Sequence, residues 1–340
     1  MAPPKAARAD ARRLRRAPLK ASGHNVGTSA LYSPGRTAHP LCAARQIDAA
    51  GRRRSQRGEV RFSSMGSTIL SIPMAEDSYM FAGSERAREL ERLRRIEGFF
   101  DPGSRRLLKA SGMGPGWSCL EVGAGAGSIA CWMAERVGLE GEVVAVDLDV
   151  GFMDASPPPG VRIIEGDIRQ LNFHAARFDL VHARYVLVHN ADFQDLLDAM
   201  LAALKPGGHL VLEEPDFTAA RGASGPDIEA FDRVNRSILA MFEADGKDPG
   251  LGLRLPAILT SRGLAIEAVE NEVPLCPGGH PLSEIMSLSA TQLQHKHLAT
   301  GRVSAEDLAG YARFAADPSA WGVYYGTVGV LARKPARISD

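Results

Sequence analysis

The stretch that most constrains the fold is "CLEVGAGAGSIACWM", residues 119–133, in which an apolar run passes through a glycine-rich turn into a second apolar run. Gly123, Gly125 and Gly127 alternate in the turn, and Glu121 stands just before them. Glycine adopts positive φ readily and lets the backbone approach a ligand closely. The helix that follows would present free N–H groups at its N-terminus. The stretch therefore predicts a strand, a ligand-binding turn and a helix.

The central region repeats this alternation of strand and helix. We expect strands at 117–123, 141–147, 161–167, 178–189 and 209–216, and helices at 128–138 and 190–208. The expected strands are apolar and rich in β-branched residues, which is typical of strands buried on both faces. The pattern predicts an α/β fold with a doubly wound, mostly parallel sheet covered by helices on both sides.

The flanking regions are mostly helical. Apolar residues recur at helical spacing over 84–100, and a second short helix is expected from Asp101, with Pro102 at its first position. Farther along, the sequence predicts helices at 225–246, 281–301 and 303–318, a helix, turn and strand over 254–275, and a closing strand at 321–335. We expect the helices of 225–316 to form a lid over the ligand.

Acidic residues end two of the predicted strands. Asp147 ends the second strand, 24 residues after Gly123, and Asp167 ends the third. Ligands of open parallel sheets bind at the carboxyl ends of the strands. A carboxylate at Asp147 can accept hydrogen bonds from both hydroxyls of a ribose, and a base edge can lie near Asp167. These positions suit an adenosine lying across the sheet.

The turn departs from the dinucleotide fingerprint G-x-G-x-x-G/A, because Ser128 occupies its last position. The segments "LEVGAGAGSIA", "VVAVDLD", "IEGDI", "FDLVHARYVLVH" and "LKPGGHLVLEEPD" together resemble class I S-adenosylmethionine-dependent methyltransferases, in the order and spacing of that family. The resemblance covers about residues 100–216 and is greatest to the small-molecule branch. It implies a Rossmann-like methyltransferase fold, a seven-stranded sheet with an antiparallel last strand, and S-adenosyl-L-methionine as cofactor.

The resemblance also implies how the cofactor is held. The three glycines of the turn would wrap its methionine part, with Glu121 beside them. Asp147 would hold the ribose, and Leu148 would pack on the adenine. Asp167 would take the adenine amino group, and Ile168 would offer a backbone N–H to the ring. Three residues at the end of the fourth strand are expected near the sulfonium and the methyl: His182, Ala183 and Arg184.

The implied reaction is an in-line attack on the methyl by an oxygen, nitrogen or carbon of a small-molecule acceptor. The protein then supplies orientation and excludes water. His189, just past the fourth strand, is the candidate catalytic base, and His182, His295 and His297 are further candidates. The alternative for His189 is that it caps the next helix or binds backbone. Family members often need no dedicated base, so the need for one stays open.

A metal site is not expected. His295 and His297 lie two positions apart, which does not put them on one helix face, and no third ligand is near in sequence. The acids of 213–216 could bind a cation or belong to a solvated loop and helix cap. Five aromatic residues could either line the acceptor pocket or pack in the core: Tyr311, Phe314, Trp321, Tyr324 and Tyr325.

Charge is distributed unevenly along the chain. Residues 1–64 carry 14 Lys and Arg against 3 Asp and Glu, a net charge of +11, and the remainder therefore carries −11. We predict a disordered basic segment at 1–74. Three interpretations of it stay open: a basic arm, an organelle transit peptide and an upstream extension. The methyltransferase domain is expected at 75–340, with a helical cover at 79–111, a cofactor-binding core at 112–216, and lid and closing strands at 217–335.

Composition narrows the classes of function further. The sequence holds no apolar run long enough for a membrane helix, and its four cysteines are scattered, which favours a reducing compartment. We therefore expect a cytoplasmic protein, or an organellar one if residues 1–64 are a transit peptide. The acidic domain makes a nucleic-acid partner unexpected. Two alternatives stay open: a cofactor-binding protein of this fold without turnover, and a nucleotide-dependent oxidoreductase.

Overall fold

The computed structural model describes Met80, Phe81 and residues 85–336, apart from residues 155, 172, 174 and 175. All of these residues fall in the unit Leu41–Asp340. The expectations for the basic segment at 1–74 lie outside the described residues. Within the described part of the chain, no helix is long and apolar enough to cross a membrane.

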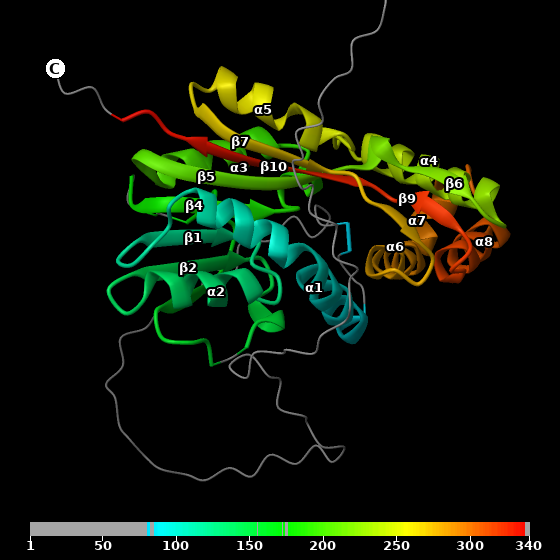
Figure 1. Ribbon diagram of the computed structural model, residues 1–340, viewed down its shortest axis with the longest axis horizontal. Coiled ribbons are helices and arrows are strands. Elements are labelled where there is room, and N and C mark those ends of the chain that lie inside the picture. The colour runs from blue at the N-terminus through cyan, green and yellow to red at the C-terminus, as the bar shows by residue number, and fades with distance from the viewer. Residues whose placement is uncertain (1–79, 82–84, 155, 172, 174–175, 337–340) are drawn as a thin grey trace, which may run out of the picture. The chain divides into compact units, whose positions relative to one another are not determined.

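A seven-stranded sheet forms the centre of the structure, with the order β3-β2-β1-β4-β5-β10-β7 (Figure 1). Its strands are β1 (Ser118–Val122), β2 (Glu142–Asp147), β3 (Val161–Glu165), β4 (Phe178–Arg184), β5 (Leu204–Asp216), β7 (Ala265–Glu272) and β10 (Gly326–Arg333). The first five strands pair in parallel, whereas β10 runs antiparallel to both β5 and β7. The predicted doubly wound sheet with an antiparallel last strand is confirmed.

Helices cover both faces of this sheet because its strands are apolar on both sides. In β1, Cys119 packs into one core cluster and Leu120 into the other. The Cys119 face is covered by α1 (Arg86–Ala110) and α2 (Ser128–Val137), which contribute Leu108 and Met133 to its cluster. The opposite face is covered by α3 (Phe193–Ala203) and α5 (Leu251–Ser261).

The first helix differs from the prediction. Residues 84–100 and the segment from Asp101 were expected to form two helices, but α1 runs unbroken across Pro102. Proline inside a helix removes a hydrogen bond and crowds the preceding turn. Here Phe100 precedes the proline and Leu107 follows it, and both are buried in the core. The packing of residues on both sides of Pro102 therefore outweighs the destabilisation that proline causes inside a helix.

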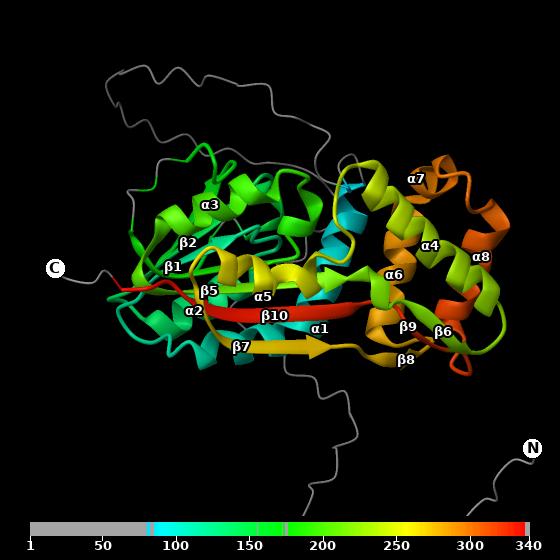
Figure 2. The ribbon, with the colours of Figure 1, turned by 90° about the horizontal axis from the view of Figure 1, so that it is seen from above.

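The lid gathers at the end of the sheet where β10 begins, as Figures 1 and 2 both show. It consists of α4 (Ile228–Ala244), α6 (Pro281–Gln292), α7 (Gln294–Ala299), α8 (Ala305–Ala316) and a small antiparallel sheet of β6 (Arg221–Ser224), β9 (Trp321–Val323) and β8 (Leu275–Pro277). The helix expected at 281–301 is two helices. The closing strand expected at 321–335 is also divided, because the buried Tyr324 and Tyr325 carry the chain from the small sheet into the large one.

Candidate functional site

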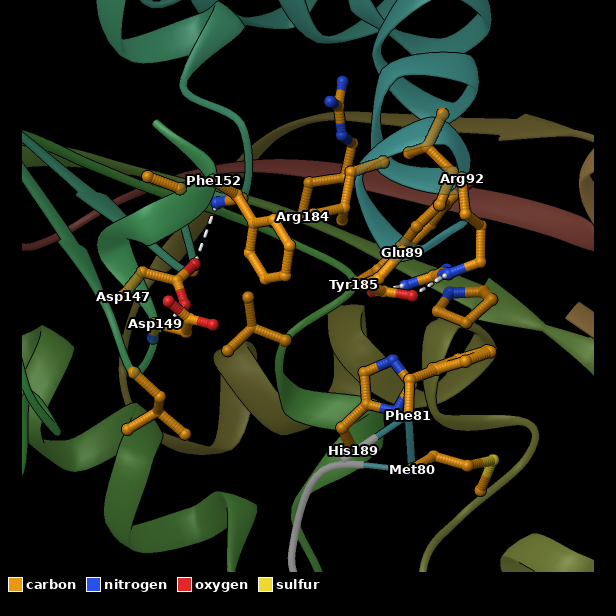
Figure 3. Close-up of a pocket in the computed structure, with 18 of the residues that line it drawn as sticks. Met80, Phe81, Glu89, Arg92, Asp147, Asp149, Phe152, Arg184, Tyr185 and His189 are labelled. Atoms are coloured by element: carbon orange, nitrogen blue, oxygen red, sulfur yellow. Dashed lines mark hydrogen bonds and ion pairs between the residues drawn. The ribbon is translucent and has the colours of Figure 1, made fainter. Parts of the chain in front are cut away.

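A cavity of about 680 Å³ lies where the carboxyl ends of the parallel strands meet α1 and the lid helices. Asp147, Asp167 and Arg184 line it from the ends of β2, β3 and β4. The lid contributes residues of α4 and α6, and Met80 and Phe81 complete the wall (Figure 3). Its volume falls within the range of small-molecule sites.

The glycine turn is tied directly to the acid at the end of β2. The backbone N–H of Gly125 donates to Oδ2 of Asp147 at 2.8 Å, and that of Asp149 donates to Oδ1 at 3.1 Å. Burial raises the pKa of Asp147, and these N–H donors oppose the rise. Gly123 has a φ of +69°, and a Cβ there would clash with the side chain of Val186. The turn therefore needs glycine for both conformation and space.

Beyond Asp147 the cavity wall is charged. The guanidinium of Arg169 donates to both carboxylate oxygens of Asp167 and reaches Asp192. Burial tends to raise the pKa of Asp167, but the bonds from Arg169 outweigh it and leave this pKa lowered. Arg86 of α1 pairs with Asp149 at 3.1 Å, and both residues line the cavity. Leu148, Ile168 and Phe152 provide apolar surface between these charges.

A fully buried histidine lies beneath the glycine turn. His182 on β4 has its Nδ1 2.8 Å from Oε2 of Glu121 on β1 and its Nε2 3.0 Å from Oε1 of Glu213 on β5. Burial lowers the pKa of a histidine, but the two carboxylates outweigh it and raise the pKa of His182 to about 9. His182 is therefore a cation between two anions, and the three side chains join three neighbouring strands.

A second buried network connects the end of β4 to α1. Arg184 donates to Oδ1 of Asp101 at 3.1 Å and to Oγ of Ser104 at 2.8 Å. The hydroxyl of Ser128, in the first turn of α2, also reaches Asp101, at 3.1 Å. The backbone N–H of Ser128 donates to Glu97, so acids from α1 satisfy this helix N-terminus. Asp101 was expected only to start a second helix, and Glu97 was not predicted to have a role, because both lie in an Arg- and Glu-rich segment.

His189 lies in a short 3-10 turn, Leu187–His189, directly after β4. Its ring approaches Phe81 at 6.4 Å and Phe242 at 6.2 Å between centroids. Burial lowers the pKa of His189 to about 3, so the ring is neutral. The turn is held by Glu214, whose two carboxyl oxygens accept hydrogen bonds from the backbone N–H groups of residues 186–188. Burial raises the pKa of Glu214 to about 8, against the effect of these N–H donors. This arrangement sets His189 in the cavity wall.

Two further features of the cavity were missed by sequence reasoning. Glu89 and Arg92 of α1 form an ion pair at 2.6 Å, with only 4% and 7% of their side chains exposed. The guanidinium of Arg92 lies 3.8 Å above the ring of Phe81. Tyr185 has a φ of 58°, which is uncommon outside glycine, and its hydroxyl bonds to Oγ1 of Thr327 at 2.6 Å. No local sequence pattern distinguishes Glu89 and Arg92 from the residues of a solvent-exposed helix face. Nor does any distinguish Tyr185 from an ordinary residue at the end of a strand.

Most of the predicted site residues line the cavity. Those that do are Glu121, Gly123, Gly125, Asp147, Leu148, Asp167, Ile168, Arg184 and His189. Three others lie outside its lining: Gly127, which caps α2 with a φ of 90°, His182, which is bonded within the sheet, and Ala183, which is in the core.

The further candidates of the sequence analysis divide in the same way. His297 lines the cavity, whereas His295 does not. Of the five aromatic candidates, Tyr325 alone lines it. Tyr311, Phe314 and Tyr324 instead pack around Phe231 in the lid, and 41% of Trp321 is exposed. Across the described residues, no group of three or more His, Cys, Asp and Glu is arranged to hold a metal.

The strand order and the position of the cavity define an α/β domain that binds its ligand at the carboxyl ends of the strands, where the order reverses next to β1. Residues 120–212 match the family described as a methyltransferase domain. Residues 120–212 thus carry a methyltransferase domain, and the resemblance to methyltransferases found in the sequence is confirmed.

Relatives among known proteins share this region. Methyltransferase str2 of Strobilurus tenacellus is 30% identical over 182 residues, which cover 49% of this chain and 62% of that protein. The ubiquinone/menaquinone biosynthesis C-methyltransferase UbiE of Idiomarina loihiensis is 30% identical over 118 residues, 32% of this chain and 47% of that protein. The chain thus spans less than two thirds of the length of either relative.

One similar solved structure is that of Haemonchus contortus phosphoethanolamine N-methyltransferase 2 in complex with phosphomonomethylethanolamine and S-adenosylhomocysteine. It aligns with this chain with a TM-score of 0.46 and 21% identity. The alignment covers 72% of this chain and 57% of that one.

Proposed function

We propose that the protein is an S-adenosyl-L-methionine-dependent methyltransferase that acts on a small molecule. The observation that carries the proposal is the glycine turn bonded to Asp147 at the edge of a cavity, within the segment that matches a methyltransferase domain. The two curated relatives, a methyltransferase and a C-methyltransferase of ubiquinone/menaquinone biosynthesis, support methyl transfer to a small acceptor.

The residues present fit the cofactor. Gly123 and Gly125 leave room for its methionine part, and the carboxylate of Glu121 in the cavity lining suits its ammonium. Asp147 would receive the ribose hydroxyls in place of one of its present N–H donors. Asp167 and the backbone of Ile168 would face the adenine, and Leu148 offers that ring an apolar surface. Arg184, fixed by Asp101, would stay nearest the methyl.

When bound, S-adenosyl-L-methionine supplies an electrophilic methyl, which the electron pair of the acceptor takes while the S–CH3 bond breaks with its electrons left on sulfur. The protein has to orient the acceptor and exclude water. The aromatic and apolar residues around His189 are suited to both tasks. Because the pKa of His189 is about 3, its neutral ring would accept a hydrogen bond from the acceptor rather than hold its proton. The proton of the acceptor would end in bulk solvent outside the cavity.

The cofactor can be tested by calorimetric titration of the full chain with S-adenosylmethionine, S-adenosylhomocysteine and NAD. We expect both sulfur ligands to bind and NAD not to bind. Asp147→Ala should weaken the sulfur ligands by about tenfold or more, since it removes a charge-assisted contact. The matched control is Asp195→Ala, an exposed acid of α3 outside the cavity, which should leave binding unchanged. Binding of NAD alone, or of none of the three, contradicts the proposal.

A further inference from the structure

The cavity has two halves of opposite chemistry, which Figure 3 shows on its two sides. The sheet half follows the strand ends and holds charged residues such as Asp147, Asp149 and Asp167. The lid half is lined by residues of α4 and α6, together with Met80, Phe81 and His189. Its wall is apolar and includes three flexible methionines: Met80, Met241 and Met286. If the sheet half holds the cofactor, the lid half is where an acceptor has to lie.

Aromatic rings form a continuous wall in the lid half. Successive rings lie 6.4 Å (Phe81 and His189), 6.2 Å (His189 and Phe242), 5.0 Å (Phe242 and Phe217) and 5.3 Å (Phe217 and Tyr325) apart between centroids. Aromatic walls favour flat ring systems, which stack against them or meet them edge to face. Methionine side chains on the other walls adapt to the outline of such a ligand.

The charges of the lid half cancel within it. Glu89 and Arg92 are bonded through two pairs of atoms, at 3.0 and 2.6 Å, so each neutralises the other. Burial lowers the pKa of His189 to about 3 and that of His297 to about 4, so both rings are neutral. Nδ1 of His297 is also bonded to the hydroxyl of Ser237 at 2.6 Å. The lid half thus offers hydrogen bonds without net charge.

We propose that the acceptor is an uncharged molecule with a planar ring, which lies against the aromatic wall of the lid half, and that acceptors carrying a carboxylate or an ammonium are rejected. This inference rests on the proposed function and specifies its substrate class. An ionised group would lose its hydration in an apolar wall. To gain a partner it would have to separate Glu89 from Arg92, which breaks an ion pair whose side chains are almost entirely buried.

Three naphthalene derivatives of similar size separate these cases: naphthol, naphthoate and naphthylmethylammonium. Each is titrated at neutral pH into the full chain saturated with S-adenosylhomocysteine, and binding is followed by calorimetry. We expect naphthol to bind about tenfold tighter than either ion, or more. Equal or tighter binding of an ion, or no binding of naphthol, overturns the inference while the proposed function stands. Failure of S-adenosylhomocysteine to bind overturns the proposed function instead.

A charge placed in the lid half gives a second test. Met286→Lys should weaken naphthol by about tenfold and shift the preference toward naphthoate, because the new ammonium supplies a partner for the carboxylate. A merely misfolded variant would not gain a ligand, and retained binding of S-adenosylhomocysteine checks the fold. The control is Leu253→Lys on α5, which is 52% exposed and outside the cavity, and its preference should stay with naphthol. An unchanged preference in Met286→Lys contradicts the inference.

Discussion

Nδ1 of His182 lies 2.8 Å from Oε2 of Glu121, and the two residues are direct partners in the parallel pairing of β1 with β4. The contact joins the strand that leads into the glycine turn to the strand that leads to His189. Since His182 is completely buried, the pair is protected from solvent screening. Its protonation state therefore affects the stability of the whole sheet.

The stability of the protein should fall as pH rises toward 9. The pKa of His182 is raised from 6.5 to about 9 in the folded state, so its contribution is complete below pH 6.5 and is lost as pH rises through about 9. The shift corresponds to a loss of about 3 kcal/mol over this interval. Urea unfolding at a series of pH values measures it.

The matched variants for this experiment are His182→Gln and His295→Gln. His182→Gln cannot carry the charge, so it should be less stable at pH 6 and should lack the decline. His295 is exposed on α7, and His295→Gln should keep the decline in full. A decline that persists in His182→Gln would assign the effect to another group.

Gly123→Ala should disturb the cavity. The φ of +69° is strained for alanine, and its Cβ would clash with Val186. We expect a loss of about 1–3 kcal/mol in unfolding free energy and weaker binding of S-adenosylhomocysteine. The control is Gly98→Ala in α1, where a Cβ meets nothing within 4 Å and alanine is the better helix former. Gly98→Ala should be neutral or stabilising, and equal losses in both variants would contradict the steric argument.

The sheet and the glycine turn were predictable because their signals are local. A buried parallel strand has to be apolar along its length, and the turn needs its glycines, so both appear directly in the sequence. Gly127 followed the same pattern, yet it caps α2 instead of lining the cavity. Alternating glycines indicate a turn, but they do not indicate which of its faces meets the ligand.

The buried charges could not be predicted because they depend on tertiary pairing. Glu121, His182 and Glu213 are far apart in sequence, and only the strand order brings them together. Glu89 and Arg92 have the spacing of an ordinary solvated pair, and it is the packing of α6 and Phe81 against α1 that buries them. Local sequence specifies which residues could pair, whereas burial determines the energy of the pair.

Glu214→Gln should weaken the turn that carries His189. The two carboxyl oxygens of Glu214 accept three backbone N–H bonds, and a glutamine side chain would turn its NH2 group toward at least one of these donors. Leaving one buried N–H without an acceptor costs about 1–3 kcal/mol. Urea unfolding should show this loss of stability, and calorimetry should show weaker binding of naphthol.

The control for Glu214→Gln is Glu229→Gln in α4. The side chain of Glu229 is 85% exposed in its ion pair with Arg233, so its replacement should change stability by less than about 1 kcal/mol. A similar small change in Glu214→Gln would mean that the turn does not depend on the carboxylate.

The Glu89–Arg92 pair should show strong coupling in a double-mutant cycle. Arg92→Met alone leaves the carboxylate of Glu89 buried without this partner, and such a change typically costs about 3–5 kcal/mol. Adding Glu89→Met removes that charge and should restore much of the loss, because apolar groups of similar size suit the surrounding wall. Urea unfolding of the four proteins gives the coupling energy. Additive losses of stability would indicate that each residue is stabilised by separate contacts. If the double variant regains stability and still prefers naphthol over naphthoate, the selectivity of the lid half comes from its apolar wall.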